Sequence, residues 1–250
     1  MRAGLALARY LLPNHCVSCE VALADRERDR LVCGMCRSRW RRVPPGCARC
    51  GQPEPPVGPC RFCREWPPCL AWARSAVWLG DEARAAVHHL KYDGYHALAG
   101  ELADAMVQMM PRPARAVLVP IPLWRKRERG RGYNQAAHLA RALGRSWKLP
   151  CATELLRRAR NTRSQTNLDP GTRIQNVAGA FRAREPSAAV KARGSKIILV
   201  DDILTTGATV VSAAQALSES GWQWVGVVTF ARATPFAVRG MVGATAVLAS

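Results

Sequence analysis

Two adjacent carboxylates and a hydroxyl-rich turn are the residues whose types and spacing point most directly to chemistry. Asp201 and Asp202 end an apolar run, and a turn containing one glycine follows at once. Carboxylates accept hydrogen bonds from vicinal hydroxyls and also favour Mg²⁺. A glycine lets the backbone approach a phosphate, and a helix amino terminus favours an anion. The pattern therefore predicts a site for a phosphorylated sugar. The candidate phosphate-binding residues are Thr205, Thr206, Gly207, Ala208 and Thr209.

The element that must position these acids is a buried strand. Aliphatic residues 197–200 suit a parallel strand covered on both faces, and open α/β folds bind ligands at the carboxyl edge of such strands. We expect the strand to fray at the acids, so that both side chains turn toward one ligand. A plain acidic turn with a threonine helix cap is the simpler alternative. A Walker-type loop is disfavoured because no Gly-Lys-Ser/Thr follows the glycine.

Two basic segments are candidates for the same site. The first follows an apolar strand at residues 116–119 and is interpreted as a loop with five cations around one acid, which suits a pyrophosphate. Its candidate ligands are Arg125, Lys126 and Arg131. The second covers residues 155–166 and 173–177, and its polar, poorly periodic character predicts a mobile loop that closes over a ligand. For both segments the alternative is a solvated face or a nucleic-acid patch.

Eight of the ten cysteines form four Cys-x-x-Cys pairs, which favours two tetrahedral zinc sites of four thiolates each. Disulfides are disfavoured by this spacing and by the absence of a convincing secretion signal in residues 1–13. Pairing in chain order gives two successive zinc ribbons, and an interleaved order is also open. Cys69 lies close enough to compete at the second site, and Cys151 is expected to be a buried apolar residue. The candidate ligands are Cys16, Cys19, Cys33, Cys36, Cys47, Cys50, Cys60 and Cys63.

The 250 residues fit a small metal module at 1–70 and an α/β domain at 71–250. Strands alternating with helices predict a parallel sheet with right-handed crossovers. The stretch 183–195 is expected to be an exposed connection. The expected strands lie at 76–79, 116–119, 197–200 and 225–230, and the expected helices lie at 81–90, 95–110, 134–147 and 210–217.

The net charge of +19 predicts affinity for polyanions that falls with salt. Tryptophans near the cysteine pairs, among many arginines, form either a stacking surface for a single strand or part of a small core. No stretch approaches the roughly 20 apolar residues of a membrane span. Together with reduced thiols, this predicts a cytoplasmic protein. The tryptophans concerned are Trp40, Trp66, Trp72 and Trp78.

Taken together, the cysteine pairs and five motifs resemble the ComF (ComFC) family of competence proteins across nearly the whole chain. The motifs occupy residues 120–123, 131–135, 163–166, 173–181 and 200–209. The last of them resembles the 5-phosphoribosyl-1-pyrophosphate (PRPP) motif of type I phosphoribosyltransferases. Tyr133 stands where many relatives carry phenylalanine.

The resemblance implies an N-terminal double zinc ribbon before a Rossmann-like phosphoribosyltransferase fold that binds PRPP with Mg²⁺. It implies that Asp201 and Asp202 hold the ribose hydroxyls, while residues 205–209 hold the 5′-phosphate. It also implies a part in natural transformation, with single-stranded DNA and other competence proteins as partners. Two functions follow: a PRPP-binding protein that assists handling of internalised DNA, or a Mg²⁺-dependent phosphoribosyltransferase for an unknown nucleophile, with both aspartates in its catalytic centre.

Overall fold

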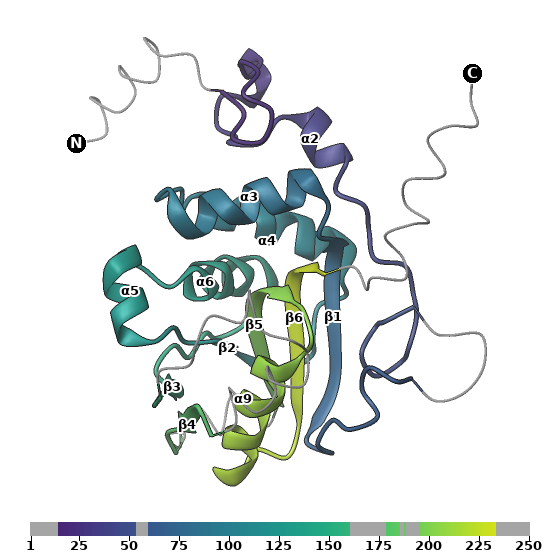
Figure 1. Ribbon diagram of the computed structural model, residues 1–250, viewed down its shortest axis with the longest axis vertical. Coiled ribbons are helices and arrows are strands. Elements are labelled where there is room, and N and C mark those ends of the chain that lie inside the picture. The colour runs from purple at the N-terminus through teal and green to yellow at the C-terminus, as the bar shows by residue number, and fades with distance from the viewer. Residues whose placement is uncertain (1–14, 54–59, 161–178, 186–187, 189–195, 234–250) are drawn as a thin grey trace.

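The computed structural model describes residues 15–53, 60–160, 179–185, 188 and 196–233, and its centre is one parallel four-stranded sheet (Figure 1). The strand order is β1-β6-β5-β2, and every neighbouring pair is parallel. The predicted α/β class with a parallel sheet is therefore confirmed. The strands are β1 (Leu70–Trp78), β2 (Ala116–Pro120), β5 (Lys196–Leu204) and β6 (Val225–Arg232).

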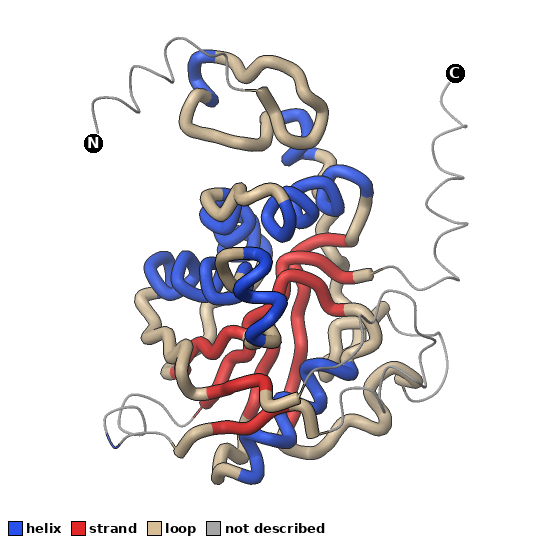
Figure 2. Tube along the Cα trace, turned by 60° about the vertical axis from the view of Figure 1, so that its left-hand side comes forward, coloured by secondary structure: helices blue, strands red, loops and turns tan. Residues whose placement is uncertain are grey.

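Helices cover both faces of this sheet, as Figures 1 and 2 show, and this explains why β5 is a continuous apolar run. Ile198 and Val200 point into the core with α3, α4 and α6, whereas Ile197 and Leu199 point into the core with α9. A strand buried on both sides has no polar alternation. The helices are α3 (Asp81–Tyr92), α4 (Leu98–Met109), α5 (Arg125–Arg131), α6 (Gln135–Trp147) and α9 (Ala208–Glu219).

Element boundaries differ from the prediction mainly at β1, which begins at Leu70 rather than at residue 76. The part of β1 before residue 76 contains Arg74 and Ser75, and these polar residues concealed the strand from a search for apolar runs. Ser75 is satisfied inside the sheet by a hydrogen bond to Thr229 on β6, with 2.7 Å between the hydroxyl oxygens. Helix α4 begins at Leu98, three residues later than expected.

The prediction of a mobile loop over residues 155–166 is wrong for its first residues, which form a strand. β3 (Leu156–Arg158) pairs with β4 (Phe181–Ala183) in a two-stranded antiparallel sheet, because Leu156 and Phe181 are buried under α9. The remainder of that loop, residues 161–178, lies outside the described residues. So do residues 1–14 and most of the expected connection at 183–195.

In the described part of the N-terminal segment, residues 15–53 and 60–69, the helices are short: η1 (Asp25–Glu27) and α2 (Gly34–Ser38). Between its two groups of cysteines the chain runs along the outer edge of β1. Arg42 pairs antiparallel with Val77, Val43 donates its N–H to the Ala76 carbonyl at 3.0 Å, and Trp78 donates to the Arg41 carbonyl at 2.8 Å. These bonds satisfy an edge that would otherwise be open. Within the described ranges, no helix is long and apolar enough to cross a bilayer.

Candidate sugar-phosphate site and metal centres

The two aspartates lie within β5 rather than at a frayed end. The ladder with β6 continues past them to Ile203 and Leu204. Successive side chains of a strand point to opposite faces, so the two carboxyls approach a ligand at the sheet edge from opposite sides. The expected fraying at the acids is wrong for this conformation, because pairing with β6 fixes their backbone.

Asp202 is buried, with 3% of its surface exposed, and is paired with Lys91 at the end of α3. The distance from Lys91 Nζ to Asp202 Oδ2 is 2.8 Å. Burial alone would lower the pKa of Lys91, but the charge of Asp202 outweighs this and raises it. Lys91 was not among the predicted site residues. Its spacing indicates burial, because Lys91 follows Ala83 and Val87 at intervals of four and thus shares the buried face of α3.

Asp201 is half-buried, and its Oδ1 accepts a hydrogen bond from the Asp202 N–H at 2.9 Å. Burial and the neighbouring Asp202 carboxylate raise the pKa of Asp201 to about 8, although Lys91 opposes the shift. Asp201 therefore favours its protonated form at neutral pH. A divalent ion at this position would favour the ionised form.

The turn after β5 has the geometry expected of an anion-binding loop. Gly207 adopts φ 84°, a left-handed conformation that favours glycine, and it precedes the 12-residue helix α9. The Ala208 N–H donates to Thr206 Oγ1 at 3.5 Å. Thr205 is exposed, while Thr206 and Thr209 are half-buried. A hydroxyl-lined helix start at the carboxyl edge of the sheet can hold a phosphate.

The predicted basic loop is in fact helix α5, and this part of the prediction was wrong. Arg, Lys and Glu have good helix propensity, and Gly132, with φ 84°, ends the helix in a left-handed conformation. Arg125 and Lys126 are exposed on α5. The Arg131 guanidinium lies 5.1 Å from the Tyr92 ring centroid and donates to Gln135 Oε1.

Tyr92 belongs to an exposed group of rings next to Lys91, which we call the aromatic patch. It joins the end of α3 and the α3–α4 connection to the start of α6. Ring centroids are 4.9 Å apart for His88 and Tyr92 and 5.7 Å apart for His89 and Tyr95. Sequence reasoning missed this patch because its members are dispersed along the chain. They are His88, His89, Tyr92, Tyr95, His96, Tyr133 and His138.

The cysteines gather in two clusters in chain order, so the interleaved alternative is rejected. The first cluster is Cys16, Cys19, Cys33 and Cys36, and the second is Cys47, Cys50, Cys60 and Cys63. In each cluster all four sulfurs lie within 4.8 Å of one another, and no cysteine forms a disulfide. Sulfur–sulfur distances of 3.8, 3.6 and 3.5 Å fit the edge of about 3.8 Å in a tetrahedron with Zn–S bonds of about 2.3 Å.

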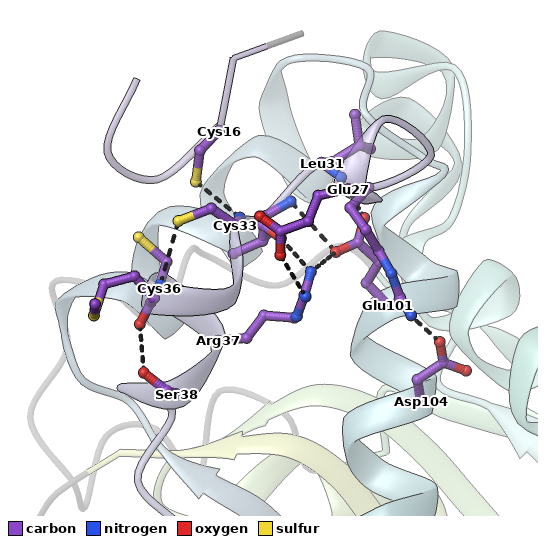
Figure 3. Close-up of polar contacts among 12 residues, drawn as sticks. Cys16, Glu27, Leu31, Cys33, Cys36, Arg37, Ser38, Glu101 and Asp104 are labelled. Atoms are coloured by element: carbon purple, nitrogen blue, oxygen red, sulfur yellow. Dashed lines mark hydrogen bonds and ion pairs between the residues drawn. The ribbon is translucent and has the colours of Figure 1, made fainter. Parts of the chain in front are cut away.

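The first cluster docks on α4 (Figure 3). Glu101 accepts hydrogen bonds from the Leu31 and Val32 N–H groups, and Arg37 pairs with Glu27 at 3.0 Å. Burial would raise the pKa of Cys16, but N–H groups of Cys33 and Ser18 point at its sulfur and lower it to about 7. Such donors stabilise a thiolate ready for a metal.

The second cluster lies on the other face of the sheet, packed with α9. Cys69 is not a member of it, because its sulfur points instead to the Ala214 carbonyl on α9, at 3.7 Å. Arg232, at the end of β6, donates to the Cys50 carbonyl at 2.7 Å. A buried guanidinium beside the cluster suits a centre in which four thiolates and one divalent ion carry net negative charge.

The tryptophans near the cysteines do not form an exposed stacking surface. Trp40 packs edge-on against Phe230 with 5.0 Å between ring centroids, and Trp66 is buried next to the second cluster. Trp72 and Trp78 are half-buried, with Trp72 packed against Trp224. The alternative of a small tryptophan core is therefore the correct one for Trp40 and Trp66.

A parallel sheet with acids on its central strand and a glycine turn beyond it defines a phosphoribosyltransferase-type protein. Residues 129–235 match the family model described as the phosphoribosyl transferase domain. A domain of this class implies a ligand of PRPP type.

Relatives that align with most of the chain define the family more closely. The DNA utilization protein YhgH of Salmonella typhimurium is 32% identical over 223 residues, covering 84% of this chain and 93% of the relative. Competence protein ComFC of Bacillus subtilis is 32% identical over 204 residues, covering 77% and 80%. Competence protein F of Haemophilus influenzae is 33% identical over 116 residues, covering 46% and 50%. The chain belongs to the ComFC/YhgH family of competence and DNA utilization proteins.

Proposed function

We propose that this protein binds PRPP with Mg²⁺ at the carboxyl edge of its sheet and assists the handling of internalised single-stranded DNA. The observation that carries the PRPP assignment is the left-handed Gly207 turn at the start of α9, five residues after Asp202 on β5. The acids for the ribose and the helix start for its phosphate are therefore close enough along the chain to bind one phosphorylated pentose.

The roles of the side chains follow from their environments. Residues 205–209 hold the 5′-phosphate through their amides and hydroxyls, and Asp201 and Asp202 accept hydrogen bonds from the ribose hydroxyls. Mg²⁺ neutralises the pyrophosphate and favours the ionised form of Asp201. Lys91 fixes the Asp202 carboxylate. The cations of α5 provide the counter-charge for the pyrophosphate end; Arg125 and Lys126 are exposed, and Arg131 is half-buried.

We assign two structural zinc ions to the N-terminal part of the protein, one for each cysteine cluster. Sulfur spacing and the N–H groups that point at Cys16 and Cys50 support this assignment. In this proposal residues 1–70 are the metal module and residues 71–250 are the phosphoribosyltransferase-like domain.

Calorimetry tests the PRPP assignment. The double variant Asp201→Asn, Asp202→Asn should lose measurable binding of PRPP in the presence of Mg²⁺ while keeping two zinc ions per chain. Asp104→Asn, an exposed acid on α4 that pairs with Arg30, is the matched control and should bind normally. Undiminished affinity of the double variant would refute the site. Pyrophosphate release, followed with and without single-stranded DNA, decides between binding alone and turnover.

The aromatic patch favours single-stranded DNA as the second ligand. Its tyrosines Tyr92 and Tyr95 are 65% and 42% exposed, and the Arg131 guanidinium lies over the Tyr92 ring. Exposed rings next to cations stack bases and neutralise phosphates. The patch also adjoins Lys91, and thereby the sugar-phosphate site.

Fluorescence anisotropy with a labelled oligothymidylate tests this surface. Tyr92→Ala combined with Tyr95→Ala should weaken binding about tenfold or more, as expected for the loss of two stacking rings. Met35→Ala removes an equally exposed apolar side chain (65%) on α2 and should have no effect. The dissociation constant should also rise steeply between low and moderate salt. Equal binding by the tyrosine and methionine variants would remove the patch from the proposal.

A further inference from the structure

The second cysteine cluster and the sugar-phosphate turn meet at one side chain, Trp66. A Cβ atom built on Gly207 would lie 3.2 Å from Trp66 Cζ2 and 3.3 Å from its Nε1. The indole therefore lies directly against the backbone of the turn. Trp66 follows Cys63 by three residues, and the backbone N–H of Trp66 donates to the Cys63 carbonyl at 3.1 Å. The turn that carries the candidate phosphate site is thus packed against a residue of the metal module.

The position of Trp66 depends on the fold around the cysteines. Arg49, which lies between Cys47 and Cys50, donates to the carbonyl groups of Trp66 at 3.0 Å and of Cys63 at 3.1 Å. The Phe62 ring packs edge-on against the Trp66 ring, with 5.7 Å between centroids. Both partners belong to the loops that carry the cysteines. A change in those loops therefore moves the indole.

Arg232 makes a second link between the cluster and the turn. It is 1% exposed, pairs in the ladder with Leu204, the residue before the turn, and donates from Nε to Gln52 Oε1 at 2.8 Å. Its guanidinium also lies 4.7 Å from the Phe62 ring centroid. The strand end that leads into the turn is thereby bonded to the segment after Cys50.

The first cluster has a different environment. It is anchored to α4 through Glu101, and the chain leaving it packs Trp40 on Phe230 of β6. These contacts stabilise the domain, but they are made with α4 and β6 rather than with residues 205–209. The two clusters therefore differ in their relation to the phosphate turn.

We propose that metal occupancy of the second cysteine cluster is thermodynamically coupled to phosphosugar binding at the 205–209 turn, with Trp66 as the positioning residue that connects them. The inference rests on the proposed function, since it takes the turn as the phosphate site. Metal bound by Cys47, Cys50, Cys60 and Cys63 holds the loops that place Trp66 against Gly207. When the metal is lost, the Trp66 indole is no longer held in place, and the turn loses the side chain that packs against Gly207. Because coupling is reciprocal, a bound phosphosugar also retains that metal.

Zinc release tests this coupling without any activity measurement. The protein loaded with two zinc ions is mixed with a chromogenic chelator, with and without saturating PRPP, in excess Mg²⁺ so that PRPP itself does not take up zinc. We expect PRPP to slow the release of one zinc ion by about tenfold and to leave the other unchanged. Cys36→Ser, which disables the first cluster, should keep the protected ion, and Cys63→Ser should lose it.

Trp66→Leu keeps all eight cysteines and guards against a cysteine variant that fails to fold. It should still bind two zinc ions, bind PRPP about tenfold more weakly, and show no protection of zinc by PRPP. Trp40→Leu is the matched control, because it removes an equally buried indole beside the first cluster, and it should keep normal PRPP affinity and protection.

The outcomes separate the inference from the proposed function. PRPP binding that slows neither zinc ion, or slows both equally, would overturn the coupling and leave the PRPP site standing. Protection that persists in Trp66→Leu would exclude Trp66 as the connection. Absence of PRPP binding to the wild-type protein would refute the proposed function and the inference with it.

Discussion

The Lys91–Asp202 ion pair permits a quantitative prediction. Lys91→Met keeps most of the apolar stem but removes the charge that lies 2.8 Å from Asp202 Oδ2. The two side chains are 20% and 4% exposed, so water cannot replace the lost partner fully. Breaking a buried pair costs about 3–5 kcal/mol, and the 20% exposure of the Lys91 side chain places the expected loss near the lower end, at about 3 kcal/mol.

Urea unfolding of the zinc-loaded protein measures this loss. A destabilisation of about 3 kcal/mol corresponds to a drop of about 6–12 °C in Tm for a chain of this size. Lys126→Met changes an exposed lysine of α5 and should stay within about 0.5 kcal/mol of wild type. Combining Lys91→Met with Asp202→Asn should restore more than half of the loss, because no uncompensated charge then remains buried.

Two results would refute this reasoning. Wild-type stability of Lys91→Met would show that Asp202 does not depend on the lysine. A double variant as unstable as the sum of the two single variants would show that the residues act independently, contrary to their contact.

The remaining predictions concern the turn, Asp201 and the metals. Gly207→Ala should weaken PRPP binding in calorimetry by about 1–2 kcal/mol, because φ 84° is unfavourable for alanine and its Cβ would press on Trp66. The folded-state pKa of Asp201, about 8, lies above its unfolded value of about 4, so the folded protein retains a proton that the unfolded chain loses. Stability should therefore fall as pH rises from about 4 to 8. In thermal unfolding at pH 8, Asp201→Asn should be more stable than wild type by about 1–2 kcal/mol, a figure reduced for the partial hydration of this carboxyl. If the variant and the wild type showed the same dependence of stability on pH, the pKa assigned to Asp201 would be contradicted. Chelation of zinc under reducing conditions should remove hydrogen-exchange protection from residues 15–53, and retained protection would show that the clusters fold without metal.

The sequence was sufficient for features that depend on local chemistry. Cys-x-x-Cys spacing predicted four-thiolate groups, and the unbroken apolar run before Asp201 predicted a strand buried on both faces. The same reasoning failed where tertiary contacts determine the position of a side chain. Nothing local indicates that Lys91 reaches Asp202, because the two are separated by most of the domain and meet only when α3 packs on β5.

Other errors have equally physical causes. The basic segment at 125–131 was interpreted by its charge, whereas its helix propensity and the glycine at its end determine its structure. The tryptophans were ambiguous because the same residue type serves a core or a stacking surface, and burial alone separates the two. Trp66 could not be linked to Gly207 from sequence, since the contact joins segments 141 positions apart.

The run of chain from Arg41 to Val43 along β1 has a practical consequence. A fragment beginning at β1 would present an unpaired outer strand with free N–H and C=O groups, which is a template for self-association. Such a fragment should precipitate or dimerise through that strand, even though it contains every residue of the phosphoribosyl transferase match. The cysteine-rich segment thus covers the outer edge of the sheet. Recombinant versions of the transferase-like domain should therefore include this segment.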